Sequence, residues 1–232
     1  MNSRKLRESP KCINVEVHLV RLDACNEFPC PDVTLPAADW HGAAEIRSLP
    51  QRNAFVATRV LLRRLLSARL GCPPAAVPII REPNGKLRLL GGGIEFSLSH
   101  CEGWCAVALS ADFAVGVDVE HIRPVPGMAD IVAHFFPPAA RAAFAAASPT
   151  HKLREFFRWW TRVEAAVKAS GRGLDNANSC FDGVTCKSCF AVPDSALAVA
   201  ARSAGPLCVT LHQAHPPSWC GFLCPSPGQS AW

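Results

Sequence analysis

Three acidic side chains and one lysine, in two separate segments, have the types and the spacing to do chemistry. In the heptapeptide A-V-G-V-D-V-E, which ends at Glu120, an extended strand would bury the valines and present Asp118 and Glu120 together on the other face. Glu164 and Lys168 are four residues apart, so a helix would place them on one flank. Three carboxylates beside an ammonium group suit Mg²⁺ bound to a polyphosphate.

The elements that must position these groups can be predicted from the same segments. Phe156, Trp160, Val163 and Val167 fall on one face of a long helix, which Ser148-Pro149 would begin and Gly171 and Gly173 would end. Each motif alone has a simpler interpretation: a solvated strand edge for the two acids, and an ordinary surface ion pair for Glu164 and Lys168.

A second polar pair is expected at the same edge of the sheet. Three strand-like segments, residues 94–99, 104–110 and 115–120, are joined by short loops and predict an antiparallel up-down-up meander. The first and third strands would run the same way, which brings Ser99 and His100 to the edge with the carboxylates. With strands about 4.8 Å apart, His100 would lie roughly 10 Å from them.

Basic residues are predicted on a helix and on a turn. The sequence S-L-P-Q from Ser48 resembles a capping box, and it opens a helix that Gly71 closes. Arg52, Arg59 and Arg63 form one ridge on this helix, which would face an anion or a partner, or else extend into solvent. Lys86 follows an Asn-Gly turn and could reach a phosphate or be solvated.

Composition sets weaker bounds. The chain has 232 residues, twelve cysteines and a formal net charge of +5, which requires neither nucleic acid nor a membrane as a partner. An alternating strand, residues 13–22, follows the charged N-terminus where a signal peptide would have its apolar core, so we expect a cytoplasmic protein with reduced thiols. A zinc cluster is the alternative, and its ligands would be Cys186, Cys189, Cys220, Cys224, His212 and His215.

Taken together, these motifs resemble a known family. G-V-D-V-E followed by W-T-R-V-E-A-A-V-K-A is similar to the paired signature of the 4′-phosphopantetheinyl transferases, most closely their longer single-chain, Sfp-like class. F-S-L-S-H, N-G-K and G-R-G-L extend the resemblance over roughly residues 49–174. It implies an α/β (α+β) fold of two similar halves, residues 1–110 and 111–232, with a mobile tail from about residue 225, and a monomer.

The resemblance also implies a reaction. A serine of an acyl or peptidyl carrier protein would attack coenzyme A and accept its 4′-phosphopantetheine arm, and 3′,5′-ADP would leave. Asp118, Glu120 and Glu164 would hold Mg²⁺, and the expected catalytic residues are Glu164 and Lys168, with Glu164 or a water on the metal taking the serine proton. The expected contacts to coenzyme A are Arg52, Arg59, Lys86, Ser99, His100 and Lys168.

One departure from the family pattern keeps other functions open. The family usually has lysine directly before the helix glutamate, where this chain has Val163. A non-catalytic module that binds coenzyme A or a carrier protein, and a Mg²⁺-dependent phosphodiester hydrolase, are the two alternatives.

Overall fold

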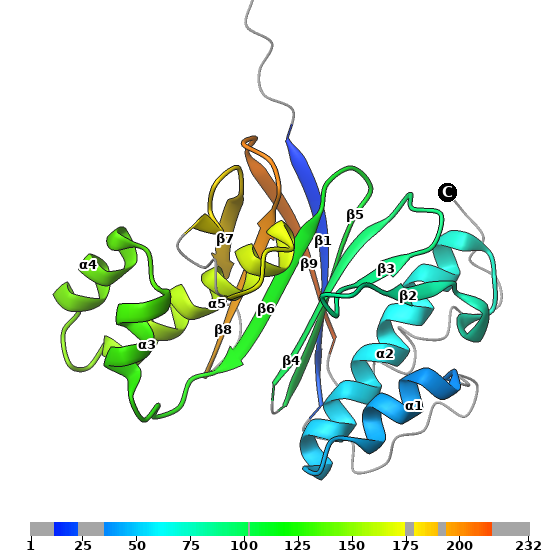
Figure 1. Cartoon of the computed structure of the whole chain (residues 1–232), viewed down its shortest axis with the longest axis horizontal. Helices are drawn as coiled ribbons and strands as arrows, with labels where there is room; N and C mark the ends of the chain where they lie inside the picture. The colour runs from blue at the N-terminus through cyan, green and yellow to red at the C-terminus, as the bar shows by residue number, and fades with distance from the viewer. Residues whose placement is uncertain (1–11, 23–34, 102, 175–178, 190–193, 215–232) are drawn as a thin grey trace, which may run out of the picture.

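The computed structural model describes residues 12–22, 35–101, 103–174, 179–189 and 194–214. It confirms the predicted α/β class: two sheets pack face to face at the centre, and helices cover the outer face of each (Figure 1). Apolar side chains from both sheets fill the space between them, among them Val15, Val17 and Leu19 from one sheet and Val117 and Val119 from the other.

The first sheet has four strands in the order β4-β5-β1-β9. They are β1 (Ile13–Arg21), β4 (Glu95–Cys101), β5 (Trp104–Ser110) and β9 (Leu207–Ala214). β5 is antiparallel to β4 and to β1, whereas β9 runs parallel to β1. β9 thus brings the last described strand of the chain beside the first.

The second sheet has three antiparallel strands in the order β6-β8-β7. They are β6 (Val115–His121), β7 (Thr185–Cys189) and β8 (Ser195–Ala201). The predicted alternation of β6 is confirmed, because Val115, Val117 and Val119 are buried between the sheets. Its other face, which carries Asp118, lies against a helix.

The outer face of the first sheet is covered by α2 (Leu49–Leu70), which packs on β4 and β5 and carries α1 (Ala37–Ala44). α2 ends at Gly71, whose φ of 66° is the left-handed conformation that glycine adopts readily. A short 3₁₀ turn, Pro74–Ala76, then leads into a hairpin of β2 (Ile79–Arg81) and β3 (Leu87–Leu89).

The second sheet is covered by α5 (Lys152–Ser170), with α3 (Met128–Phe135) and α4 (Pro138–Ala146) beyond it (Figure 1). The predicted apolar face of α5 is confirmed: Phe156, Val163 and Val167 are buried against the sheet, and Trp160 packs beside them. Gly171 ends the helix as predicted.

The predicted meander is wrong at its third strand. β4 and β5 form the expected hairpin, but β6 pairs with β8 in the other sheet instead of with β5. Short loops indicate that strands follow each other closely, but they do not decide whether the next strand continues the same sheet or crosses to a second one.

Other predicted boundaries are also corrected. α5 begins at Lys152 rather than at Ser148, and Ser48 makes no side-chain cap on α2. The sequence did not predict the hairpin of β2 and β3, the helix α1 or the strand β7. A further strand, which we expect at residues 219–223 from the sequence, and the expected tail lie outside the described residues. The division of the chain at residue 110 and the similarity of its two halves stay predictions. β9, which belongs to the predicted second half, pairs within the first sheet.

The expectation of reduced thiols is wrong for one pair. Cys12 and Cys208 form a disulfide across β1 and β9, because parallel pairing brings their Cα atoms to 6.1 Å. Cys72, Cys105 and Cys180 are among the free thiols of the described part of the chain. Cys220, Cys224 and His215 of the alternative zinc cluster lie outside that part. No described helix has the length and apolar character needed to span a membrane.

Candidate active site

Serine hydroxyl groups of β4 connect the two sheets at the site. Ser99 Oγ donates to Asp118 Oδ1 at 2.8 Å and accepts the N–H of Val119 at 3.2 Å. Two residues earlier, Ser97 Oγ accepts the N–H of Val117 at 3.1 Å. β4 and β6 therefore lie side by side as the site requires, although side chains rather than a backbone ladder join them.

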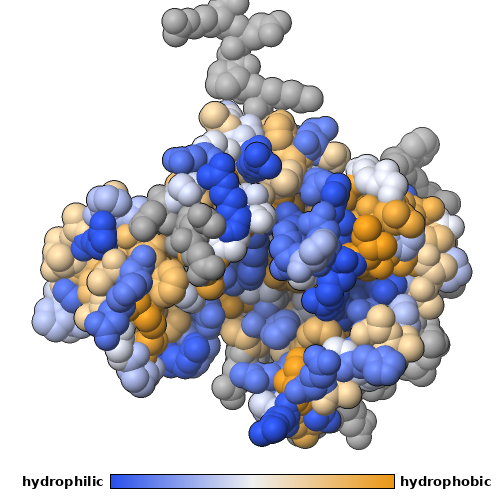
Figure 2. All heavy atoms as spheres, in the orientation of Figure 1, coloured by the Kyte–Doolittle hydropathy of each residue, from blue (hydrophilic) through white to orange (hydrophobic). Residues whose placement is uncertain are grey.

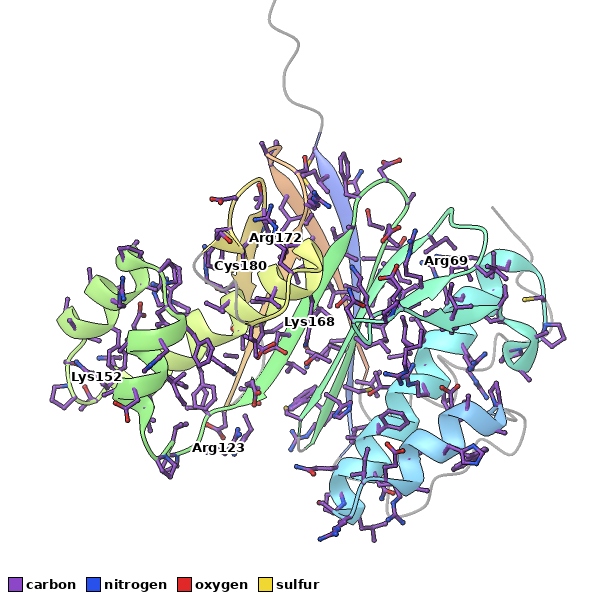
Figure 3. All side chains as sticks on the ribbon, in the orientation of Figure 1. Arg69, Arg123, Lys152, Lys168, Arg172 and Cys180 are labelled. Carbon is purple, nitrogen blue, oxygen red and sulfur yellow. A yellow bond between two sulfur atoms is a disulfide. The ribbon has the colours of Figure 1, made fainter. Side chains whose placement is uncertain are left out.

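A glycine allows α5 to approach β6 closely. A Cβ atom at Gly116 would lie 1.9 Å from the carbonyl oxygen of Ala165 and 2.7 Å from the nitrogen of Ala169. With only hydrogen at this position, the helix lies directly on the strand, and Lys168 reaches across: its Nζ lies 2.7 Å from Asp118 Oδ1 and 3.1 Å from the carbonyl oxygen of Val117. Figure 3 shows Lys168 near the middle of the molecule, where α5 lies over β6.

A cavity of about 320 Å³ opens between these elements. It brings together most of the residues predicted to form the site; its lining is Phe55, Thr58, Arg59, Leu98, Ser99, His100, Asp118, Glu120, Glu164 and Lys168. Figure 2 shows hydrophilic side chains gathered over the central part of the same view, between the helical layers on either side. Asp118, Glu120 and Glu164 thus face one cavity. A solvated strand edge and a separate surface ion pair would not bring these three acids together.

The electrostatics of this cavity favour a cation. Burial, followed by the charge of Asp118, raises the pKa of Glu164 to about 7, although Lys168 opposes the shift. Burial and Asp118 also raise the pKa of Glu120, against the effect of Arg123. Asp118 is only 4% exposed, and its Oδ2 atom accepts no hydrogen bond from the described residues. A buried carboxylate oxygen of this kind is costly unless a ligand satisfies it.

Basic groups line the opposite wall. Burial lowers the pKa of His100, and the charges of Lys168 and Arg59 add to the effect, which favours the neutral imidazole. Arg59 is buried and pairs with Asp39 of α1, with 3.7 Å between Arg59 Nε and Asp39 Oδ1. Arg63 donates to the other oxygen of Asp39 at 2.6 Å, so this carboxylate orients two arginines of α2.

A second cavity of about 350 Å³ adjoins the first and shares Arg59, Leu98 and Lys168 with it. The turn of the β2–β3 hairpin contributes Lys86, whose Nζ donates to the carbonyl oxygen of Lys168 at 3.0 Å. This contact places an ammonium group at the C-terminal end of α5, where the helix dipole favours it. Lys86 thus belongs to the same region as the acids, from the turn that the sequence predicted.

Arg52 is the predicted residue that the structure does not bring to the site. Its guanidinium donates to the carbonyl oxygen of Ile46 at 3.0 and 2.8 Å, and it lines neither cavity. Sequence reasoning also missed Ser97 and Asp39. The alternation of F-S-L-S-H places Ser97 on the same face as Ser99, which is a signal that could have found it; nothing near Asp39 in the sequence points to Arg63.

Comparison with known proteins decides the family. The chain is similar to the 4′-phosphopantetheinyl transferase HetI of Nostoc sp., with 32% identity over 166 residues that cover 68% of this chain and 70% of the relative. The model of the 4′-phosphopantetheinyl transferase superfamily matches residues 114–222. The chain belongs to this superfamily.

Other relatives of this transferase carry the same name. The 4′-phosphopantetheinyl transferase AcpT of Salmonella typhimurium is 34% identical over 55% of this chain and 65% of its own length. The 4′-phosphopantetheinyl transferase of Bacillus subtilis is 27% identical, over 50% of each chain. The family match begins at the strand that carries Asp118 and Glu120 and includes all of α5, so the carboxylates of the cavity lie inside it.

The departure at Val163 has a structural explanation. Val163 of the transferase is fully buried, in the apolar cluster between α5, α3 and the second sheet. A lysine at this position would lie in the apolar cluster and would not face the cavity.

Replacing Val163 by lysine should therefore destabilise the protein. Burying an unpaired ammonium group costs about 3 kcal/mol or more, to be measured as the free energy of unfolding in urea. Val163→Ala, which removes volume without adding charge, is the control and should cost about 1–2 kcal/mol. A lysine variant as stable as the wild type would show that the position can reach solvent or an anion.

Proposed function

We propose that this enzyme transfers the 4′-phosphopantetheine arm of coenzyme A to a serine of an apo acyl or peptidyl carrier protein and releases 3′,5′-ADP. The family supports the class of reaction, and the main structural support is the cavity on which Asp118, Glu120, Glu164 and Lys168 converge. We further propose that the chain belongs to the longer, Sfp-like class.

The residues of the cavity fit Mg²⁺. The ion prefers oxygen donors and keeps several positions for water and phosphate oxygens. Asp118, with its unsatisfied buried Oδ2, would hold it together with Glu120 and Glu164, whose pKa values are raised by burial and by the charge of Asp118. When bound, Mg²⁺ would neutralise charge on the pyrophosphate of coenzyme A.

The basic residues would bind and orient the remaining phosphate charge. Lys168 lies between the acids and both cavities, and Arg59 and Lys86 extend the positive charge into the larger one. Ser99 holds Asp118 in place, and the neutral imidazole of His100 can donate one hydrogen bond to a phosphate oxygen. Arg52 remains a predicted contact, although its guanidinium is engaged by Ile46.

Glu164 is our candidate for the group that takes the proton of the attacking serine. Its carboxylate lines the same cavity as Asp118 and Lys168, so it would lie close to a serine hydroxyl that enters this cavity. Its place on the cavity wall, four residues before Lys168, would leave the serine between a proton acceptor and the cations that hold the phosphate.

The proposal is tested by mass spectrometry of the carrier. The enzyme, Mg²⁺ and coenzyme A are incubated with apo carrier proteins of the fatty-acid, polyketide and nonribosomal-peptide types. Transfer adds the mass of one phosphopantetheine arm to the carrier and produces 3′,5′-ADP. Hydrolysis of coenzyme A without any carrier adduct would favour the hydrolase, and binding of coenzyme A without either product would favour the binding module.

The raised pKa of Glu164 predicts how Mg²⁺ binding to the free enzyme depends on pH. Protons compete with the ion below a pH of about 7, so affinity should fall by up to about tenfold for each pH unit below that value. Calorimetric titrations between about pH 5.5 and 8 would measure this slope. Asp112→Asn, which removes an exposed acid just before β6, is the control and should keep the slope. Affinity that stays constant from acid to neutral pH would contradict the assignment.

A further inference from the structure

A second group of possible metal ligands lies on the first sheet, apart from both cavities. His18 of β1 and His212 of β9 are direct partners in the parallel register. Glu16 precedes His18 by two residues and therefore shares its face of the strand. One oxygen of Glu16 and one ring nitrogen of each histidine all lie within 4.8 Å of one another.

The two imidazoles are already arranged side by side. Their ring centroids are 4.6 Å apart and the rings are inclined by only 12°. His18 is buried, whereas the side chain of Glu16 is 47% exposed and its Oε2 lies 3.6 Å from His18 Nε2. The group thus has a fixed inner side and an outer side that solvent reaches.

We propose that Glu16, His18 and His212 form a zinc site. Two imidazoles and one carboxylate are a common ligand set for Zn²⁺, which binds them at about 2.0–2.2 Å in a tetrahedral arrangement. Because the donor atoms lie within 4.8 Å of one another, we infer that side-chain rotation can bring them to one ion. The solvent side leaves the fourth position to water.

Arg69 of α2 is the competing cation at this site. It forms an ion pair with Glu16 through the same oxygen that approaches His18. Zinc would have to displace this contact or use the other carboxylate oxygen. The competition predicts that removal of the guanidinium tightens zinc binding.

The position of the site sets it apart from the proposed transfer reaction. β9 and β4 are opposite edges of the four-stranded sheet, so β9 lies about 14 Å from the strand that carries Ser99. The disulfide between Cys12 and Cys208 joins the same two strands as the proposed zinc ligands. Zinc would therefore hold β9 on β1 near the middle of the strands, and the disulfide holds it at their start.

The test is equilibrium dialysis of the full chain against Zn²⁺, with the disulfide intact and with excess Mg²⁺ to occupy the carboxylate cavity. Wild-type protein should bind one zinc ion per chain more than either Glu16→Gln or His212→Asn, in which affinity at this site should fall more than about tenfold. Arg69→Gln should bind zinc more tightly than the wild type. His134→Asn, which removes an exposed histidine of α3, is the matched control and should bind as the wild type does.

Two further readouts separate this site from thiols. Co²⁺ bound in place of zinc should give visible bands of a tetrahedral ion without a thiolate charge-transfer band, and Zn²⁺ should raise the thermal midpoint of the wild type but not of Glu16→Gln. Because Glu16 is exposed, this variant decides the result if His212→Asn does not fold. Zinc binding that is the same in wild type and Glu16→Gln, or no zinc binding by wild type, would overturn the proposal.

Discussion

Replacing Asp118 by asparagine should reduce transfer to the carrier by at least about a thousandfold while the protein stays folded. The amide keeps the size of the side chain and can still accept from Ser99, but it removes the negative charge nearest to Lys168. The loss of attraction to Lys168 is offset by relief of repulsion from Glu120 and Glu164, so the free energy of unfolding should change little. Mass spectrometry of the carrier and urea denaturation measure the two effects separately.

Glu164→Gln gives a stronger form of the same test. In the metal-free protein the pKa of Glu164 is raised above its ordinary value of 4.5 to about 7, so the folded state binds more protons than the unfolded state between these values. Its carboxylate therefore costs stability as pH rises through this window. Glutamine should abolish transfer and also stabilise the metal-free protein by about 1–2 kcal/mol at pH 8, a value reduced for partial solvent screening.

A matched control is available in the loop before β6. Asp112 is exposed, and Asp112→Asn should leave both transfer and stability at wild-type values. Turnover at the wild-type rate in either Asp118→Asn or Glu164→Gln would end the proposed metal site, whatever happened to stability.

Gly116→Ala should have the largest effect on the fold. The added Cβ would lie 1.9 Å from the backbone oxygen of Ala165, and a backbone atom in a helix cannot rotate away as the end of a side chain can. α5 must move off β6, and we expect a loss of about 3 kcal/mol or more in the free energy of unfolding. Any variant that still folds should also lose transfer, because the shift separates Lys168 from Asp118.

The same substitution elsewhere provides the comparison. A Cβ at Gly42 of α1 would lie 3.0 Å from the tip of the Phe55 ring, which can move, and alanine favours the helix by up to about 1 kcal/mol. Gly42→Ala should therefore be neutral or slightly stabilising in urea denaturation. Equal stability of the two variants would mean that β6 and α5 do not approach as closely as described.

The sequence predicted those parts of the site that depend on local periodicity. The alternation of Val115, Val117 and Val119 determined which face of β6 carries the acids, and the spacing within α5 determined that Glu164 and Lys168 lie together. These patterns are direct consequences of strand and helix geometry. The sequence also predicted that the acids of β6 and the Glu164–Lys168 pair of α5 meet, because three carboxylates and an ammonium group together suit Mg²⁺ bound to a polyphosphate.

The parts that sequence reasoning missed depend on contacts between distant segments. The spacing of three strands could not indicate that β6 leaves the first sheet. β6 still lies beside β4, but the hydroxyls of Ser97 and Ser99 take the place of a backbone ladder between the two strands. Helical spacing placed Arg52 beside Arg59, but the long arginine side chain turns back to Ile46. Cys12 and Cys208 are 196 residues apart, and no spacing rule identifies such a pair.

The serine contacts between β4 and β6 have a consequence for solubility. β6 is the edge strand of its sheet, and an open edge is a template to which a strand of another molecule can add. Here the outward N–H groups of Val117 and Val119 are satisfied by Ser97 and Ser99, and the ammonium group of Lys168 covers the carbonyl of Val117. The polar side chains around the cavity thus also block aggregation by strand addition along this edge.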